Sequence, residues 1–207
     1  MKCFNSEKDA ESTQALVTAM RLLCHEGKYP IEHITTEKYY FPFNRLRNIL
    51  KEMLSEKRTN SHLFTRFKEY GAYLDVLFYS WKLLPGLTTK GTQTSVNYIQ
   101  NYFNLITVIP ITTEVQESKQ LFCESTEAHH CNYQNQFTFD YGAVRKYLNN
   151  AWRCAIKWDF SDHGTHKQIL IVLLETIMPH LEKPVLLTDF LMDSLDVGEC
   201  TFIVYYC

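Results

Sequence analysis

The sequence predicts an all-α protein in which antiparallel helix pairs stack into an α-solenoid. Apolar side chains recur three and four residues apart through most of the 207 residues, which is the period of amphipathic helices. Polar segments with Pro or Gly separate these stretches, as expected for connections between helices. The stretch 169–178 is apolar on nearly every side, and a helix of that composition needs neighbours on almost every face.

The first predicted helix spans 12–26, with Ser12 as its N-cap and Gly27 as its stop. This assignment follows because Ser is favoured at helix starts and Gly just past helix ends. A second helix is predicted from about 44 to 56, where large apolar residues again recur at helical spacing.

The segment 61–84 is predicted to form one long helix, or two helices that break near Gly71. Pro85 and Gly86 are expected to end it, because Pro and Gly interrupt helices. A further helix is predicted over 96–109, and the many aromatic side chains of both segments are interpreted as core residues.

The stretch 111–136 contains few core residues and is predicted to be a polar insertion or long loop. Helical periodicity resumes over 140–158, and residues 161–163 are expected to connect it to the apolar helix. A Pro-bounded turn and a last helix that stops at Gly198 follow. Stacked pairs of this kind resemble HEAT or armadillo repeats, although no clean repeat of about 40 residues is visible.

Composition indicates a soluble intracellular protein. The formal net charge is -2, from 21 Lys+Arg and 23 Asp+Glu, which gives no global reason for tight binding to nucleic acid. The start of the chain lacks the apolar core of a signal peptide, and no apolar run approaches the about 18 residues of a membrane span. Seven cysteines without a CxxC pair favour reduced thiols over a disulfide framework.

No catalytic, cofactor or metal site is predicted. Cys123, His129, His130 and Cys131 carry zinc-ligand atoms, but their spacing matches no zinc-binding pattern. No Cys and His are placed as a nucleophile and its base. The glycines lack the context of a phosphate-binding loop.

Positive charge gathers between Arg45 and Lys68. This region could contact RNA phosphates, or it could simply form a solvated helix surface, and the sequence favours the second interpretation. It lacks RNA-recognition and KH signatures, so any RNA contact would use backbone charge and shape. The candidate residues are Arg45, Arg47, Lys51, Lys57, Arg58, Arg66 and Lys68.

Three blocks of sequence occur in order: QALVTAMRLLCHEGKYP at 14–30, then YFP at 40–42 with LFTRFKEY at 63–70, then 167–198. Together they resemble the CCAAT-binding-factor-like family and, within it, the nucleolar complex protein 4 group. The resemblance is weak through 86–135 and absent at both ends of the chain. Its signature positions in the last block are Pro179, Pro184, Asp189, Phe190, Leu191 and Gly198.

The resemblance implies a non-enzymatic ribosome-biogenesis factor of the nucleus and nucleolus. It would act as a scaffold in the small-subunit processome, support small-subunit rRNA processing, and pair with nucleolar protein 14. It also implies a division into helical repeats at 12–110, the insertion at 111–136, the start of the CCAAT-binding-factor-like domain at 137–198, and a divergent tail at 199–207. On this interpretation the solenoid is incomplete at its C-terminus. A sequence-tolerant RNA-binding module is the alternative.

Overall fold

The computed structural model describes residues 4, 6–30, 39–88, 94–113, 120–123, 137–158 and 162–196. Within these ranges the chain is helical and has no β-strand, which confirms the all-α prediction. A π-helical turn, Leu173–Ile177, and two 3-10 turns, Met178–His180 and Pro184–Leu187, connect the last two helices. The α-helices are α1 Asp9–Lys28, α2 Phe43–Met53, α3 Ser61–Tyr70, α4 Leu74–Leu87, α5 Val96–Val108, α6 Tyr141–Ala155, α7 His163–Val172 and α8 Thr188–Asp196.

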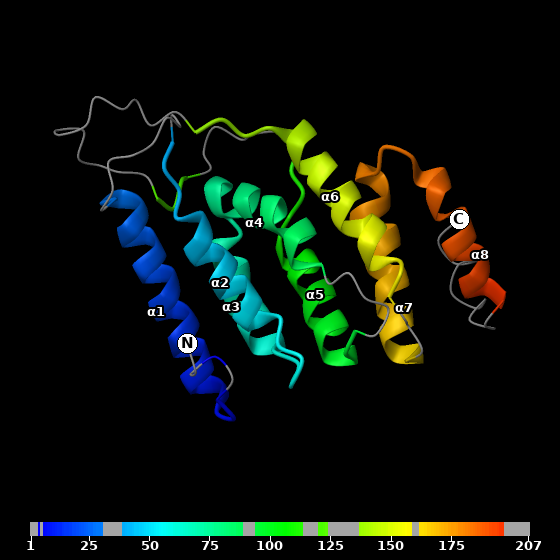
Figure 1. Cartoon of the computed structure of the whole chain (residues 1–207), viewed down its shortest axis with the longest axis horizontal. Helices are drawn as coiled ribbons and strands as arrows, with labels where there is room; N and C mark the ends of the chain where they lie inside the picture. The colour runs from blue at the N-terminus through cyan, green and yellow to red at the C-terminus, as the bar shows by residue number, and fades with distance from the viewer. Residues whose placement is uncertain are drawn as a thin grey trace.

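The helices lie side by side in a row that runs from α1 at one end to α8 at the other (Figure 1). Contacts join alternate helices: α1 contacts α3, α3 contacts α5, and α5 contacts α7, while α2 contacts α4 and α4 contacts α6. The odd-numbered helices from α1 to α7 therefore form one layer, and α2, α4 and α6 form a second. Buried apolar side chains from both layers make one extended hydrophobic core.

Side-chain caps begin three of the helices. Ser95, Asp140 and Asp162 precede α5, α6 and α7, and each accepts a hydrogen bond from the backbone N–H three residues further on. Such a bond satisfies one of the free N–H groups of the first turn. The predicted connector at 161–163 ends one residue too late, because Asp162 caps a helix that already begins at His163. The preceding helix also ends earlier than predicted, at Ala155 and not at 158.

The predicted break near Gly71 is confirmed, since α3 ends at Tyr70 and α4 begins at Leu74. The prediction that Pro85 and Gly86 end the helix is wrong, because α4 continues to Leu87. Pro85 removes only one backbone donor near the end of the helix. The N–H of Thr88 still bonds the carbonyl of Leu84 and closes the last turn.

The predicted limits of the first helix are wrong. α1 begins at Asp9, so Ser12 lies inside the helix and is not its cap. Gly27 is also inside α1, where it permits a close approach to another segment. A Cβ at position 27 would lie 2.5 Å from both Cβ and Sγ of Cys123. Packing, and not helix termination, is the reason for a glycine at this position.

One further prediction needs correction. Within the predicted polar insertion, residues 121–123 pack against the core, because Cys123 is only 1% exposed and Phe122 lies against the rings of Tyr70 and Tyr73. Residues 114–119 and 124–136 lie outside the described part of the chain. In the apolar stretch 169–178, Ile171 is 42% exposed, so the described residues leave part of this apolar surface uncovered. The buried residues of this stretch are Ile169, Val172, Leu173 and Ile177.

Candidate nucleic-acid interface

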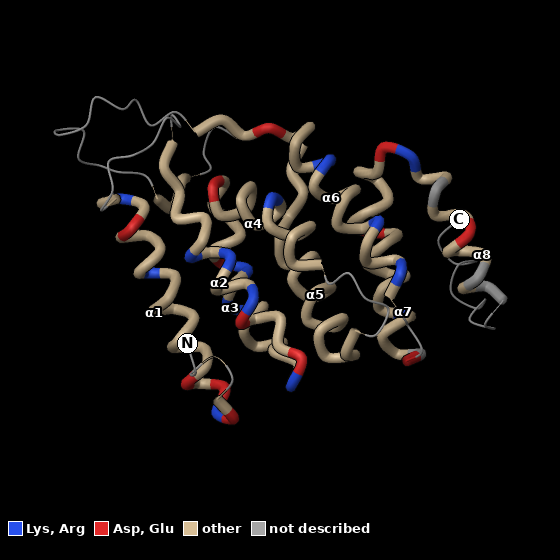
Figure 2. The backbone as a smooth tube through the Cα atoms, viewed as in Figure 1, with Lys and Arg blue, Asp and Glu red and all other residues tan. Residues whose placement is uncertain are grey.

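The seven predicted basic residues lie on α2, on α3 and on the turn between them (Figure 2). The two helices bury their apolar stripes and leave the charged positions at the surface. The structure does not bring the seven together as one site. It separates them into a group that is neutralised by acidic partners and a group that is not.

Three arginines of the region are paired with carboxylates. Arg45 forms a hydrogen-bonded ion pair with Glu26 of α1. The Nη2 atom of Arg58 lies 2.6 Å from Oδ1 of Asp9, and its Nη1 donates to the carbonyl of Ser6 at 2.6 Å. These two pairs fasten the α2–α3 region to α1. A guanidinium that is already paired with a carboxylate is poorly placed to take a phosphate, because the phosphate must compete with that partner.

The third pair is local. Arg66 lies 2.7 Å from Oε1 of Glu69, one turn further along α3. Arg66 also lies over the ring of Tyr70, with Cζ 6.0 Å from the centroid. An exposed pair of this kind contributes little to stability, but it cancels the charge that the sequence assigned to the candidate site.

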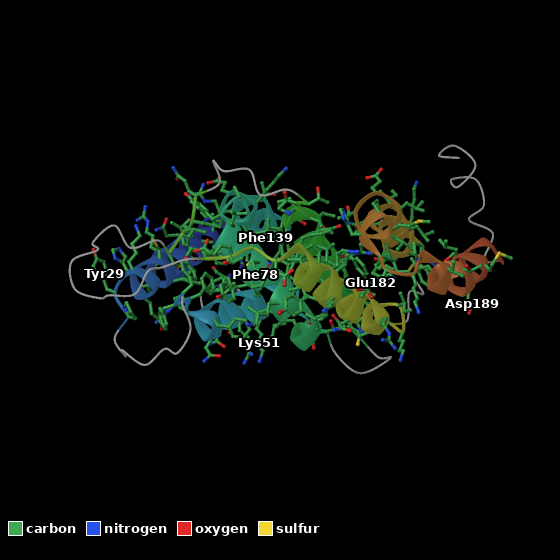
Figure 3. The ribbon with its side chains drawn as sticks, turned by 90° about the horizontal axis from the view of Figure 1, so that it is seen from above. Tyr29, Lys51, Phe78, Phe139, Glu182 and Asp189 are labelled. Atoms are coloured by element: carbon green, nitrogen blue, oxygen red, sulfur yellow. The ribbon has the colours of Figure 1, made fainter. Side chains whose placement is uncertain are left out.

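The remaining four cations, Arg47, Lys51, Lys57 and Lys68, are exposed and form no ion pair with any residue that the structure describes. Arg47 is held by an aromatic ring, with its Cζ 5.0 Å from the centroid of Phe43. Figure 3 shows Lys51 at the outer edge of the molecule.

Lys82 of α4 also lies at this surface, although it was not among the basic residues predicted from the sequence. Its Nζ lies 5.4 Å from the Phe43 centroid and 5.5 Å from the Tyr79 centroid. The only available signal was that Lys82 is the sole basic residue of an apolar helix. Lys82 lies near Phe43 of α2, and the two residues meet only because α2 and α4 pack together.

A Ser–His–Asp arrangement also occurs, between α1 and α3. The Ser12 hydroxyl lies 2.7 Å from Nε2 of His62, and His62 Nδ1 lies 3.5 Å from a carboxylate oxygen of Asp9. These residue types occur together in nucleophilic catalysis. However, Ser12 is fully buried and donates its proton to the Asp9 carbonyl at 3.0 Å. The hydroxyl cannot meet a substrate, so the arrangement is a link between two helices.

The described signature positions belong to the segment from Met178 to α8, near the other end of the row, where Figure 3 labels Asp189. Pro179, Pro184 and Asp189 are exposed. Phe190 is half-buried and lies edge-on to Trp152 of α6, with centroids 6.3 Å apart. Leu191 is half-buried as well, and Gly198 is outside the described residues. The structure does not bring the five described positions next to the basic region.

Comparison with known proteins decides the relationship. The chain is 28% identical over 190 residues to nucleolar complex protein 4 homolog A of Xenopus laevis, and the match covers 89% of this chain. It is 25% identical over 195 residues to the Danio rerio homolog and 21% identical over 189 residues to the Homo sapiens homolog. The chain is similar in sequence to the nucleolar complex protein 4 homologues along most of its length. The predicted resemblance is confirmed.

The matches cover 35% to 36% of these relatives, so the chain spans about a third of their length. The name that these relatives share places them in a nucleolar complex. No family model matches the chain. No solved structure matches it. Across the described helices, none is both long and apolar enough to cross a membrane.

Proposed function

We propose that this chain is a non-enzymatic ribosome-biogenesis factor, a helical scaffold that works in the nucleolus within the small-subunit processome. The observation that carries the proposal is the similarity to nucleolar complex protein 4 homologues along 89% of the chain. In this proposal the chain supports processing and assembly of small-subunit rRNA through its surfaces. Nucleolar protein 14 and other processome proteins are its partners, and the pre-rRNA is contacted directly or through them.

The arrangement of helices supports the solenoid part of the proposal. In HEAT-like and armadillo-like repeats, each helix pair stacks on the next, so alternate helices lie in the same layer. The contacts of α1 with α3, α3 with α5 and α5 with α7 follow this rule, as do those of α4 with α2 and α6. Such a row offers a long surface to partners. The division at 12–110, 111–136, 137–198 and 199–207 belongs to the same proposal.

Affinity purification from nuclei tests this function. The tagged chain is expressed, and the bound proteins and RNA are identified by mass spectrometry and by probes for small-subunit precursor rRNA. We expect processome proteins and precursor rRNA to be enriched. A matched control carries Asp75→Ala, which removes a fully buried carboxylate and weakens the fold. If the folded chain recovers no more of these components than the control does, the scaffold proposal fails.

A further inference from the structure

We propose that the exposed face of α2, together with Lys82 of α4, binds the phosphate backbone of RNA. This inference goes beyond the scaffold function and does not depend on it. It also differs from the site expected from the sequence, because it excludes the paired arginines Arg45, Arg58 and Arg66 and includes a residue from another helix.

The exposed residues of α2 are all cations or amides. Its exposed positions are Asn44, Arg47, Asn48 and Lys51, which recur three and four residues apart and so lie along one side of the helix. They span about 10 Å of helix axis. No acidic residue lies between Phe43 and Lys51. The polyanion therefore meets no carboxylate from Phe43 to Lys51, and the next residue, Glu52, is half-buried.

Lys82 of α4 is the third cation of this surface, beside Arg47 and Lys51. The ring of Phe43 holds two of the three, Arg47 and Lys82, in place. Arg47 and Lys82 approach this one ring, with Cζ at 5.0 Å and Nζ at 5.4 Å from its centroid. A cation held over an aromatic face keeps its charge and loses part of its side-chain freedom before any ligand binds. Less freedom is then lost on binding, which favours a bound anion.

Aromatic packing fixes α2 against α4 at this point. The rings of Phe41 and Tyr79 stack with centroids 4.2 Å apart and an interplanar angle of 8°. Phe43 lies edge-on to the same Tyr79 ring, with centroids 6.1 Å apart. Both Phe41 and Tyr79 are buried. The position of Lys82 relative to Arg47 is therefore set by the core, so the surface does not depend on a loop.

The chemistry of this face fits RNA better than an acidic peptide. Evenly spaced phosphates can follow a line of cations, and the interleaved Asn44 and Asn48 amides can bond phosphate oxygens and 2′-hydroxyls. Nothing on the face distinguishes one base from another, so binding should be sequence-tolerant. For a single strand, the logarithm of the binding constant falls with the logarithm of the salt concentration with a slope of about -0.7 for each neutralised phosphate. Three cations therefore predict a slope of about -2.

The test uses the whole chain and a fluorescein-labelled oligouridine in an anisotropy titration, with a labelled RNA hairpin as a second arm. The test variant is Arg47→Gln/Lys51→Gln/Lys82→Gln. The control variant is Lys146→Gln/Arg153→Gln/Lys157→Gln, which removes the same charge from exposed positions on and just after α6. Circular dichroism checks that both variants remain folded, as expected for exposed side chains.

We expect the unmodified chain to bind oligouridine roughly 10- to 20-fold more weakly at about 200 mM salt than at about 50 mM. The test variant should lose most of this binding, whereas the control variant should keep it. Arg47→Lys/Lys51→Arg should also bind, because it preserves the charge. Binding of the hairpin with the same variant pattern would support the proposal equally, and would add the duplex to the RNA forms that this face accepts.

Three outcomes would overturn the proposal. The test and control variants could lose binding equally, which would mean that total charge and not this face attracts RNA. Both RNAs could fail to bind even at the lower salt concentration. A labelled polyglutamate peptide could bind the face while both RNAs do not, which would make an acidic protein segment the ligand.

Discussion

In the interior of the protein, the Tyr39 hydroxyl donates a hydrogen bond to the Asp75 carboxylate, with 2.8 Å between the hydroxyl oxygen and Oδ2. The two residues are 36 positions apart in the sequence. The same carboxylate accepts the backbone N–H groups of Phe122 and Cys123, each at 2.9 Å. One fully buried side chain therefore fixes two segments, the one before α2 and the one at 120–123, against the start of α4.

Replacement of Asp75 by Ala should be strongly destabilising. The change leaves the Tyr39 hydroxyl and at least two backbone donors buried without an acceptor, and each costs about 1–3 kcal/mol. We expect a loss of at least about 3 kcal/mol in the free energy of unfolding, measured by urea titration. Tyr39→Phe removes only one donor and should cost about 1 kcal/mol. Equal losses in the two variants would contradict this role of Asp75.

Gly27→Ala should destabilise the protein although Ala favours helices. The new Cβ would lie 2.5 Å from Cβ and Sγ of Cys123, and overpacking of this kind costs about 1–3 kcal/mol. Gly86→Ala is the matched control. Gly86 also lies in a helix, α4, but a Cβ at this position would meet open space, with no neighbouring atom within 4 Å. This control should therefore stabilise the protein by up to about 1 kcal/mol.

A double mutant locates the cause of the Gly27 effect. Cys123→Gly removes both atoms that the new Cβ would meet. If the clash is responsible, Gly27→Ala/Cys123→Gly should be less destabilised than the sum of its single variants, when all are compared by urea unfolding. Strict additivity would show that the clash does not decide the effect.

Thiol reactivity should differ among the cysteines. Burial, with the nearby Asp75, raises the pKa of the Cys123 thiol well above its ordinary value, and burial also raises the pKa of Cys24. Cys154 is exposed. Because the thiolate is the reactive species, iodoacetamide should modify Cys154 at least about tenfold faster than Cys123 in the native protein. Peptide mass spectrometry measures both rates, and equal rates would contradict the burial of Cys123.

Stability should fall as the pH falls below about 6.5, the ordinary pKa of histidine. Burial lowers the pKa of His62, outweighing the opposing effect of Asp9, and Arg58 lowers it further. Burial, with Arg145, also lowers the pKa of His180. A histidine whose pKa is lowered on folding binds its proton more readily in the unfolded chain, so acid favours unfolding.

The check compares urea unfolding at about pH 7.5 and about pH 5.5 for the unmodified chain and for His62→Gln/His180→Gln. The double variant starts from a different stability, so the informative quantity is the change between the two pH values. That change should be smaller in the variant. An identical change in both proteins would mean that other groups cause the pH dependence.

Local signals in the sequence were enough to predict most helices. The periodicity of apolar residues identified the helical segments, and Gly71 correctly marked the break between α3 and α4. The same rules failed at Gly27 and Pro85, where tertiary packing and the end of a helix changed the meaning of the residue. From the sequence alone, a glycine that permits close packing, as Gly27 does against Cys123, cannot be distinguished from a glycine that ends a helix.

The candidate site was less predictable because it depends on contacts between distant residues. The sequence showed seven cations close together, but the carboxylates of Glu26 and Asp9 that neutralise two of them come from α1. Lys82 approaches Phe43 only because α2 packs on α4. The partners of Asp75 were equally hard to predict, since Phe122 and Cys123 lie in the stretch that was expected to be a polar insertion with few core residues.

The proposed scaffold role requires the chain to be present in small-subunit precursor particles. Sedimentation of nucleolar extract through a sucrose gradient, with the tagged chain followed beside small-subunit precursor rRNA, measures this presence. We expect the folded chain to sediment with these particles, whereas Asp75→Ala should do so much less. A folded chain that remains at the top of the gradient, apart from precursor rRNA, would contradict the scaffold role.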